Sequence, residues 1–207
     1  MPRSSSSTTT PRPAKGERRN RDAEVMEAAV RIFYEKGYSG ASLQDVANEV
    51  GVLKGSLYYY FDSKEDLLLR IMKESHIQSE LIFDRVSAKG LDPLDELDEL
   101  LQELMQWYLD NVERVAIYFN EGRRLTGERL EEVEAAGRRF EQHLYNLLKR
   151  AQKGGAIQDV DLRLSIRFIL GALNSVPTWH KPSSQRRLSD KAITRQFAQM
   201  TIKSMSP

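Results

Sequence analysis

The chain has 207 residues, of which 40% are hydrophobic and 29% charged, so it is long enough to bury a core and ordinary for a globular protein. Lys and Arg total 31 against 30 Asp and Glu, and the net charge of +1 does not by itself indicate nucleic-acid binding. The lack of cysteine excludes disulfides and thiolate chemistry, and no apolar run reaches the roughly 18 residues that a membrane span needs. We therefore expect a cytoplasmic protein without a membrane partner.

Residues 1–20 are rich in serine, threonine, proline and arginine and offer little apolar surface to bury. Such a composition predicts a disordered arm. Six of the first 21 residues are basic, and Glu17 is the only acidic one among them. Two interpretations stay open: a solvated tail without a role, and a basic arm in which Lys15, Arg18 and Arg19 contact DNA phosphates or a minor groove.

Residues 21–66 predict a head of three helices. The first helix should run from about residue 22 to residue 36, where Gly37 closes it. The second should follow Ser42, which forms a short capping box with Asp45, and it should end at Gly51. A glycine turn between two short helices is typical of a helix-turn-helix.

The segment after this turn has an unusual outward face. Inward positions carry apolar or aromatic residues, whereas the outward positions carry Lys54, Gly55, Ser56, Tyr58 and Tyr59. A helix lying in the major groove would use such a face, because glycine permits close approach and hydroxyl groups reach phosphates or base edges. The alternative is that residues 58–60 are all core, which we favour for Tyr60 alone.

The body, residues 67–207, also reads as helical throughout, so we predict an all-α chain of about nine helices. The predicted body helices cover residues 64–87, 93–111, 112–125, 126–153, 162–176 and 190–204. The segment 162–176 is apolar on nearly every side and therefore needs neighbours on every side. We expect it to pair with the last helix and with their symmetry mates in a homodimer, with burial inside one chain as the alternative.

The stretch AAVRIFYEKGYSGASLQDVANEVGVLKGSLYYYFDSKEDLL, residues 28–68, resembles the head of the tetracycline-repressor (TetR) family, most specifically in GSLYYYF and SKEDLL. The resemblance implies a homodimer that binds a palindromic DNA operator and releases it when a small-molecule effector enters the body. It also implies DNA-facing positions at Ser42, Gln44, Lys54, Gly55, Ser56, Tyr58, Tyr59 and Lys64. Among these, residues 54–56 would lie nearest the base edges, and residues 42, 58, 59 and 64 would meet phosphates.

Lys54 is the only long hydrogen-bond donor on the outward face. A single good bidentate base contact discriminates by only roughly 1 to 3 kcal/mol. We therefore expect DNA specificity to depend also on dimer spacing and on DNA shape.

The segments VAIYFNEGRRL, residues 115–125, and RFILGALNSVPTWHKP, residues 167–182, resemble the TetR subgroup that responds to acyl-CoA thioesters of fatty, aromatic or sterol catabolism. Some sterol-responsive members hold CoA through arginine and tryptophan in the second segment. Here those places carry Leu170, Asn174 and Thr178, which argues against that particular ligand.

An acyl-CoA sensor needs an apolar slot for the acyl chain and cations for the phosphates. We expect Arg123 and Arg124 at the mouth, with Glu121 beside them. The slot would be lined by Trp107, Tyr108, Tyr118, Phe119, Phe140, Asn174 and Trp179. Two alternatives stay open: the aromatic residues are simply core, or the effector is a lipophilic drug of an efflux system, with Glu121 as its counter-charge.

An enzyme is the rival class of function. His76, His143 and His180 are far apart in sequence, and the chain has no Glu-x-x-His pair, no His-x-x-x-His pair and no glycine-rich phosphate loop. We therefore expect no catalytic residues, no metal site and no cofactor.

Overall fold

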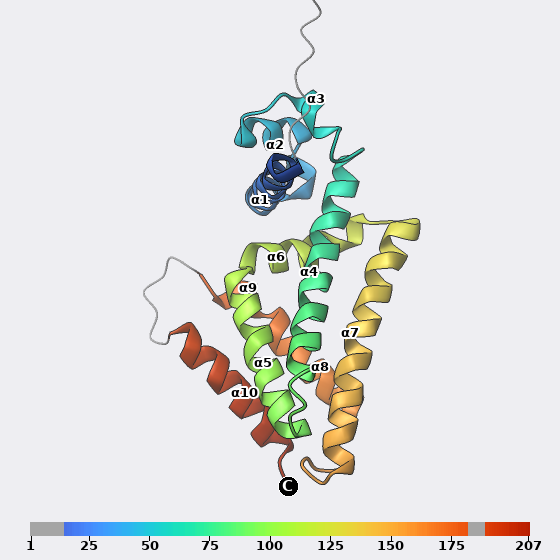
Figure 1. The fold of residues 1–207 in the computed structure, drawn as a ribbon, viewed down its shortest axis with the longest axis vertical. Coiled ribbons are helices and arrows are strands. Elements are labelled where there is room, and N and C mark those ends of the chain that lie inside the picture. The colour runs from blue at the N-terminus through green and yellow to red at the C-terminus, as the bar shows by residue number, and fades with distance from the viewer. Residues whose placement is uncertain (1–14, 182–188) are drawn as a thin grey trace, which may run out of the picture.

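The computed structural model describes residues 15–181 and 189–207, with side chains from residue 21 onward, and all regular structure in these residues is helical (Figure 1). The first fourteen residues of the predicted arm lie outside the described residues. The all-α prediction is confirmed. The elements are α1 (Lys15–Gly40), α2 (Leu43–Val50), α3 (Lys54–Leu57), α4 (Lys64–Ser87), α5 (Pro93–Asp110), α6 (Val112–Glu121), the 3-10 turn η1 (Gly122–Arg124), α7 (Gly127–Lys153), α8 (Leu162–Asn174), α9 (Val176–Trp179) and α10 (Asp190–Met205).

The helix boundaries lie close to the predicted ones, with four differences. Helix α6 ends at Glu121, where η1 begins, and not at residue 125. Helix α1 begins at Lys15, so the last six residues of the predicted arm are helical, and Gly37 interrupts the helix with a φ of 67°. Helix α3 is one turn long, shorter than predicted. The single turn α9 follows α8 as an element that the sequence did not predict.

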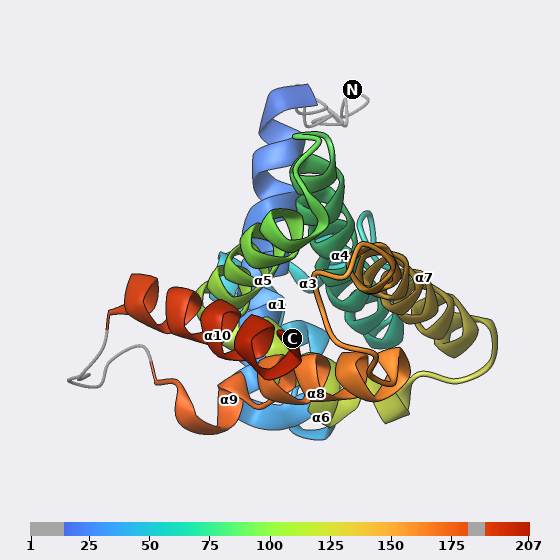
Figure 2. The same cartoon turned by 90° about the horizontal axis from the view of Figure 1, so that it is seen from below.

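Helix α4 joins the head to the body (Figure 1). Its first half packs in the head core through Leu67, Leu68 and Ile71, whereas Phe83 and Val86 belong to the core of the body. Figure 2 shows α8 and α10 at an outer face of the body.

Helix α6 also belongs to both parts of the molecule. Ile117 is 2% exposed and packs in the head core, although its helix lies far beyond the head in sequence. Val112, at the start of the same helix, packs in the body core. Helix α6 therefore carries a part of each core.

An ion-pair network ties α1, α4 and α6 together. Arg114 of α6 pairs with Glu27 of α1 and, at 3.3 Å, with Glu74 of α4. Arg70 of α4 pairs with Asp22 of α1 and, at 3.1 Å, with Glu74. The Arg114 side chain is only 13% exposed, so its charge requires these carboxylates.

We predict that Ile117→Ala lowers the free energy of unfolding by about 2 to 5 kcal/mol, because the substitution leaves a cavity in the head core. Urea unfolding followed by circular dichroism measures this. Leu81→Ala is the matched control, since Leu81 lies on α4 with half of its surface exposed and should change stability by less than about 0.5 kcal/mol. An equal effect of the two substitutions would contradict the shared packing of α6.

Candidate functional site

The start of α2 presents two of the predicted DNA-facing residues, Ser42 and Gln44, with exposed side chains. The predicted capping box is confirmed: the Asp45 backbone N–H donates to Ser42 Oγ at 3.2 Å, and the Ser42 backbone N–H donates to Asp45 Oδ2 at 2.8 Å. Lys36 also donates to Asp45, and this bond, together with those from Ser42, lowers the pKa of Asp45 to about 2. The first turn of α2 is therefore anchored by a carboxylate that stays charged at neutral pH.

The recognition segment is a single helical turn followed by hydrogen-bonded turns. The backbone N–H groups of Tyr60 and Phe61 both donate to the Leu57 carbonyl oxygen, at 2.8 and 3.0 Å. Leu57 and Phe61 are buried in the head core. Together these contacts fix which side of the segment faces outward.

The outward side chains lie where the sequence predicts. Tyr58 is 49% exposed and Tyr59 is 87% exposed, whereas Tyr60 packs against the head core. The alternative that all three tyrosines are core is therefore wrong for the first two. Lys54 is exposed and Ser56 half-buried on the same segment.

Gly55 and Leu53 add to this face. A β-carbon at Gly55 would meet no other atom of the described chain within 4 Å, so internal packing does not demand glycine there. Leu53, which sequence reasoning missed, is 81% exposed beside Lys54. An exposed leucine beside a lysine suits contact with a thymine methyl group next to a polar base contact.

Lys64 differs from the other predicted DNA-facing residues. Its ammonium donates to the backbone carbonyl oxygens of Tyr38 at 2.6 Å and Ala41 at 2.9 Å, and it lies 4.3 Å from the centre of the Tyr38 ring. These contacts turn the ammonium toward the junction of α1 and α2. The predicted contact of Lys64 with a DNA phosphate stays a prediction.

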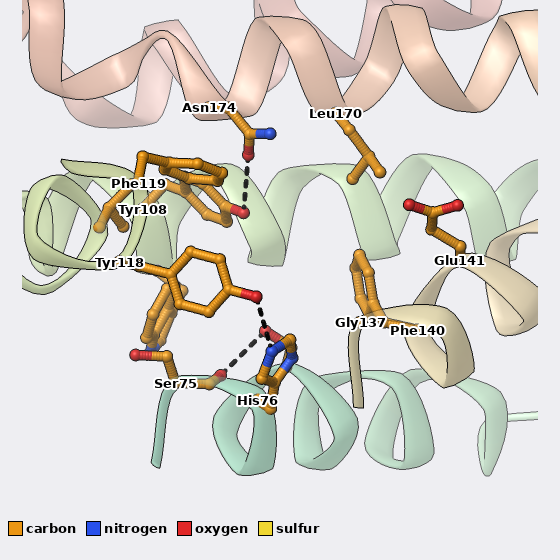
Figure 3. Close-up of a pocket in the computed structure, with 13 residues that line it drawn as sticks. Ser75, His76, Tyr108, Tyr118, Phe119, Gly137, Phe140, Glu141, Leu170 and Asn174 are labelled. Carbon is orange, nitrogen blue, oxygen red and sulfur yellow. Dashed lines mark hydrogen bonds between the residues drawn. The ribbon is translucent and has the colours of Figure 1, made fainter. Parts of the chain in front are cut away.

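A cavity of about 150 Å³ lies in the body among α4, α5, α6, α7 and α8 (Figure 3). Six of the ten predicted ligand residues line it: Trp107, Tyr108, Tyr118, Phe119, Phe140 and Asn174. Seven further lining residues were missed: Ser75, His76, Ser79, Val115, Gly137, Glu141 and Leu170.

The remaining predicted ligand residues lie outside the cavity lining. Glu121 Oε1 accepts from the Tyr38 backbone N–H at 3.1 Å, while its Oε2 accepts from Arg124 Nε at 3.4 Å. Arg123 and Arg124, expected at the mouth, lie in η1 outside the cavity lining, and the next residue, Leu125, packs in the head core. Trp179 is half-exposed on α9, and its Nε1 donates to Ser175 Oγ at 3.1 Å.

One polar pair in the cavity joins α4 to α6. His76 Nε2 lies 2.9 Å from the Tyr118 hydroxyl (Figure 3). Burial lowers the pKa of His76 below its ordinary value, with Glu80 opposing and Arg139 adding to the shift. Burial likewise raises the pKa of Tyr118 to about 12. Both side chains are therefore neutral at pH 7, as a cavity for an apolar group requires.

A second polar pair joins α5 to α8. The Tyr108 hydroxyl donates to Asn174 Oδ1 at 3.2 Å (Figure 3). Burial raises the pKa of Tyr108 above its ordinary value. In the same cavity the Ser75 and Ser79 hydroxyls donate to backbone carbonyl oxygens one turn earlier in α4. The wall is thus largely apolar, with a few neutral polar groups and the one carboxylate of Glu141, a composition usual for a small-molecule site.

No cluster of metal-ligating side chains occurs among the described residues. Within the same part of the chain, no helix is long and apolar enough to cross a membrane.

Comparison with known proteins decides the family. The model described as "Bacterial regulatory proteins, tetR family" matches residues 25–71, and the model described as "Tetracyclin repressor-like, C-terminal domain" matches residues 90–205. The chain belongs to the TetR family. It is therefore a DNA-binding transcriptional regulator, and the helix-turn-helix identified above is the head of this family.

Relatives and solved structures agree with this membership. The HTH-type transcriptional repressor KstR2 of Rhodococcus jostii is 25% identical over 184 residues, covering 88% of this chain and 89% of that protein. A ketosteroid transcriptional regulator structure, KstR2 of Mycobacterium tuberculosis, has a TM-score of 0.82 at 23% identity and covers 90% of this chain and 95% of its own. AibR, solved in complex with isovaleryl coenzyme A and operator DNA, has a TM-score of 0.77 at 26% identity and covers 90% and 98% of the two chains.

We predict that Lys54→Ala weakens binding to the cognate operator by about 1 to 3 kcal/mol and weakens binding to random DNA less, because the side chain reads a base edge. Fluorescence anisotropy with both DNAs measures the two affinities. Lys73→Ala is the control, since Lys73 pairs with Glu132 in α7 away from the recognition segment. An equal loss on both DNAs would refute base reading by Lys54.

We also predict that stability falls as the pH drops below about 6.5. The folded state holds His76 at a lowered pKa, so the unfolded chain takes up a proton first, and each pH unit removes up to about 1.4 kcal/mol until the folded state is protonated as well. In His76→Gln this contribution disappears, whereas Tyr118→Phe retains it. Urea unfolding at pH 7.5 and 5.5 measures the difference, and equal pH dependence of wild type and His76→Gln would contradict the prediction.

Proposed function

We propose that this regulator is a homodimeric repressor that binds a palindromic operator in the cytoplasm and leaves it when a short-chain or aromatic acyl-CoA thioester enters the body. The observation that carries the proposal is that one helix, α6, lines the cavity and also holds the head. Tyr118 and Phe119 of α6 line the cavity, and Glu121, at the end of the same helix, accepts a hydrogen bond from Tyr38 in the head.

The size of the cavity supports a small acyl group. An apolar cavity of about 150 Å³ is the size that binds benzene in an engineered protein, so this cavity fits roughly five or six carbon atoms. A branched five-carbon acyl group meets this limit, and so does the six-carbon ring of a benzoyl group when its carbonyl stays at the cavity wall, whereas the four fused rings of a sterol skeleton exceed it. The relative solved with isovaleryl coenzyme A supports the same class of effector.

The neutral polar groups of the cavity suit a thioester. Asn174 and the two tyrosines offer hydrogen-bonding atoms at the wall, and none of these groups is charged at pH 7. A thioester carbonyl needs one hydrogen-bond donor and no counter-charge. This wall therefore accepts an uncharged acyl thioester more readily than a free carboxylate.

The release mechanism follows from packing. An acyl group that fills the cavity presses on Tyr118 and Phe119, and α6 responds as a unit because cores are close-packed. The shift would reach the head through Glu121 and through the ion pairs of Arg114. A change in the spacing of two recognition segments away from roughly 34 to 36 Å then lowers operator affinity.

The homodimer is supported by the outer face of the body. Leu164 and Phe168 of α8 are 70% and 57% exposed, and Met200 of α10 is 71% exposed. The opposite side of α8 packs in the body core through Ile166 and Ile169. An apolar face on both α8 and α10 supports a two-fold interface built from these helices.

One observation favours a second effector class. Glu141 lines the cavity and could serve as the counter-charge of a lipophilic cation, as for a drug-responsive regulator of an efflux pump. This role replaces the one that the sequence suggested for Glu121.

The test is displacement of operator DNA. With the chain bound to a labelled operator from its own promoter, isovaleryl-CoA and benzoyl-CoA should lower the anisotropy to that of free DNA, whereas free CoA should not. Release by a lipophilic cation that does not intercalate into DNA, such as tetraphenylphosphonium, without release by any acyl-CoA, would overturn the acyl effector in favour of the alternative class.

We predict that the double variant Leu164→Glu/Phe168→Glu is monomeric, because two carboxylates cannot be buried unpaired in an apolar interface. Operator affinity should fall at least tenfold, since a monomer loses the second half-site. Leu81→Glu changes an exposed leucine of α4 and should remain dimeric. Light scattering after size exclusion measures the mass. A double variant that is still dimeric would contradict a dimer interface built from α8 and α10.

A further inference from the structure

A second hollow, of about 440 Å³, lies between α7 and α8. It is lined by Arg138, Gln142 and Tyr145 of α7 and by Arg163, Ile166 and Arg167 of α8. We call it the arginine groove. Glu141 lines both this groove and the cavity, so the two hollows adjoin at that residue.

The close-up shows at which end of the cavity Glu141, the residue shared with the groove, lies. Glu141 and Leu170 lie at one end, and Tyr108 and Phe119 lie at the other (Figure 3). A ligand held at the aromatic end would therefore extend past Leu170 and Glu141 before it reaches the arginines.

The arginines of the groove are only weakly neutralised. Arg167 Nη1 lies 3.9 Å from Glu141 Oε1, and Arg138 Nη1 lies 3.4 Å from Glu134 Oε2. Arg163 makes no ion pair with any described residue. The groove thus offers three guanidinium groups, which bind phosphate oxygens through paired hydrogen bonds.

The cavity and the arginine groove differ in polarity, as do the apolar acyl group and the charged phosphates of an acyl-CoA. The cavity has five aromatic side chains in its wall, which suits an acyl group that leaves water. The groove has exposed guanidinium groups, which suits phosphates that keep part of their hydration. The arginines first expected for this task, Arg123 and Arg124, lie beside the head instead.

We propose that the arginine groove binds the phosphate-bearing head of the effector while the acyl group fills the cavity. The inference rests on the proposed function and adds to it the place of the anionic part and the direction from which the ligand enters. Arg163 and Arg167 contact the phosphates, and Glu141 sets the selectivity at the junction.

Removing the charge of Glu141 should change the affinities for anionic and cationic ligands in opposite directions. In the empty protein its carboxylate faces Arg167, and it repels an approaching phosphate. Removing this charge while keeping the side chain's shape should therefore strengthen the binding of an anionic ligand. A cationic ligand would bind more weakly to the same variant.

The experiment is calorimetry with two probes that carry the same acyl group. Isovaleryl-CoA has the phosphates, and the isovaleryl thioester of N-acetylcysteamine lacks them. The double variant Arg163→Ala/Arg167→Ala should lose at least tenfold in affinity for isovaleryl-CoA and less than twofold for the short thioester. Glu141→Gln should bind isovaleryl-CoA several-fold more tightly, and Arg123→Ala/Arg124→Ala, the control, should bind both probes as the wild type does.

Arg163→Lys/Arg167→Lys keeps the charge and should recover part of the CoA affinity, which separates charge recognition from a loss of folding. If the Arg163→Ala/Arg167→Ala variant binds isovaleryl-CoA as tightly as the wild type does, the groove does not bind the phosphates. An equal loss of affinity for both probes would lead to the same conclusion. Either result would leave the acyl effector itself in place. Tighter binding of CoA esters to Glu141→Gln supports the groove, and weaker binding overturns it. Failure of the wild type to bind either probe would overturn the acyl effector and the groove together.

Discussion

The hydrogen bond between Glu121 and the Tyr38 backbone N–H joins the two halves of the molecule at the point where α1 turns into α2. Glu121 ends the helix whose Tyr118 lines the cavity and whose Ile117 packs in the head core. On the other side of the same turn, Lys64 of α4 donates to the Tyr38 and Ala41 carbonyl oxygens. The α1–α2 turn is thus held from α4 and α6 at once, so the head cannot move without one of these helices.

The recognition face sets how much specificity one head can supply. It offers a single exposed lysine, two exposed phenols and a glycine that internal packing does not require. Lys64, expected to add a phosphate contact, is committed to the α1–α2 turn. In the homodimer that we propose, the distance between two heads would therefore matter as much as the bases that each one reads, and a change of that distance would release DNA.

The head could be predicted from sequence because its determinants are local. Ser42 and Asp45 form a capping box within three residues, and Gly51 has a φ of 72° at the helix end, the conformation that glycine favours. The cavity depends instead on helices distant in sequence. Its aromatic residues were predicted, but Ser75 and His76 were missed, although polar residues interrupting the apolar stripe of α4 are a signal for such a wall. Glu121 was misplaced because spacing cannot show which way a chain turns after a helix.

In the mechanism that we propose, α6 transmits ligand binding to the head, and the effect of Glu121→Ala on the coupling between ligand and operator measures this transmission. For the wild type and the variant, operator affinity is measured with and without saturating isovaleryl-CoA, and ligand affinity is measured by calorimetry. We expect the variant to bind the ligand with unchanged affinity. The coupling free energy, which is the loss of operator affinity that the ligand causes, should fall from about 1 to 3 kcal/mol in the wild type toward zero in the variant. Full coupling in Glu121→Ala would contradict the proposed mechanism.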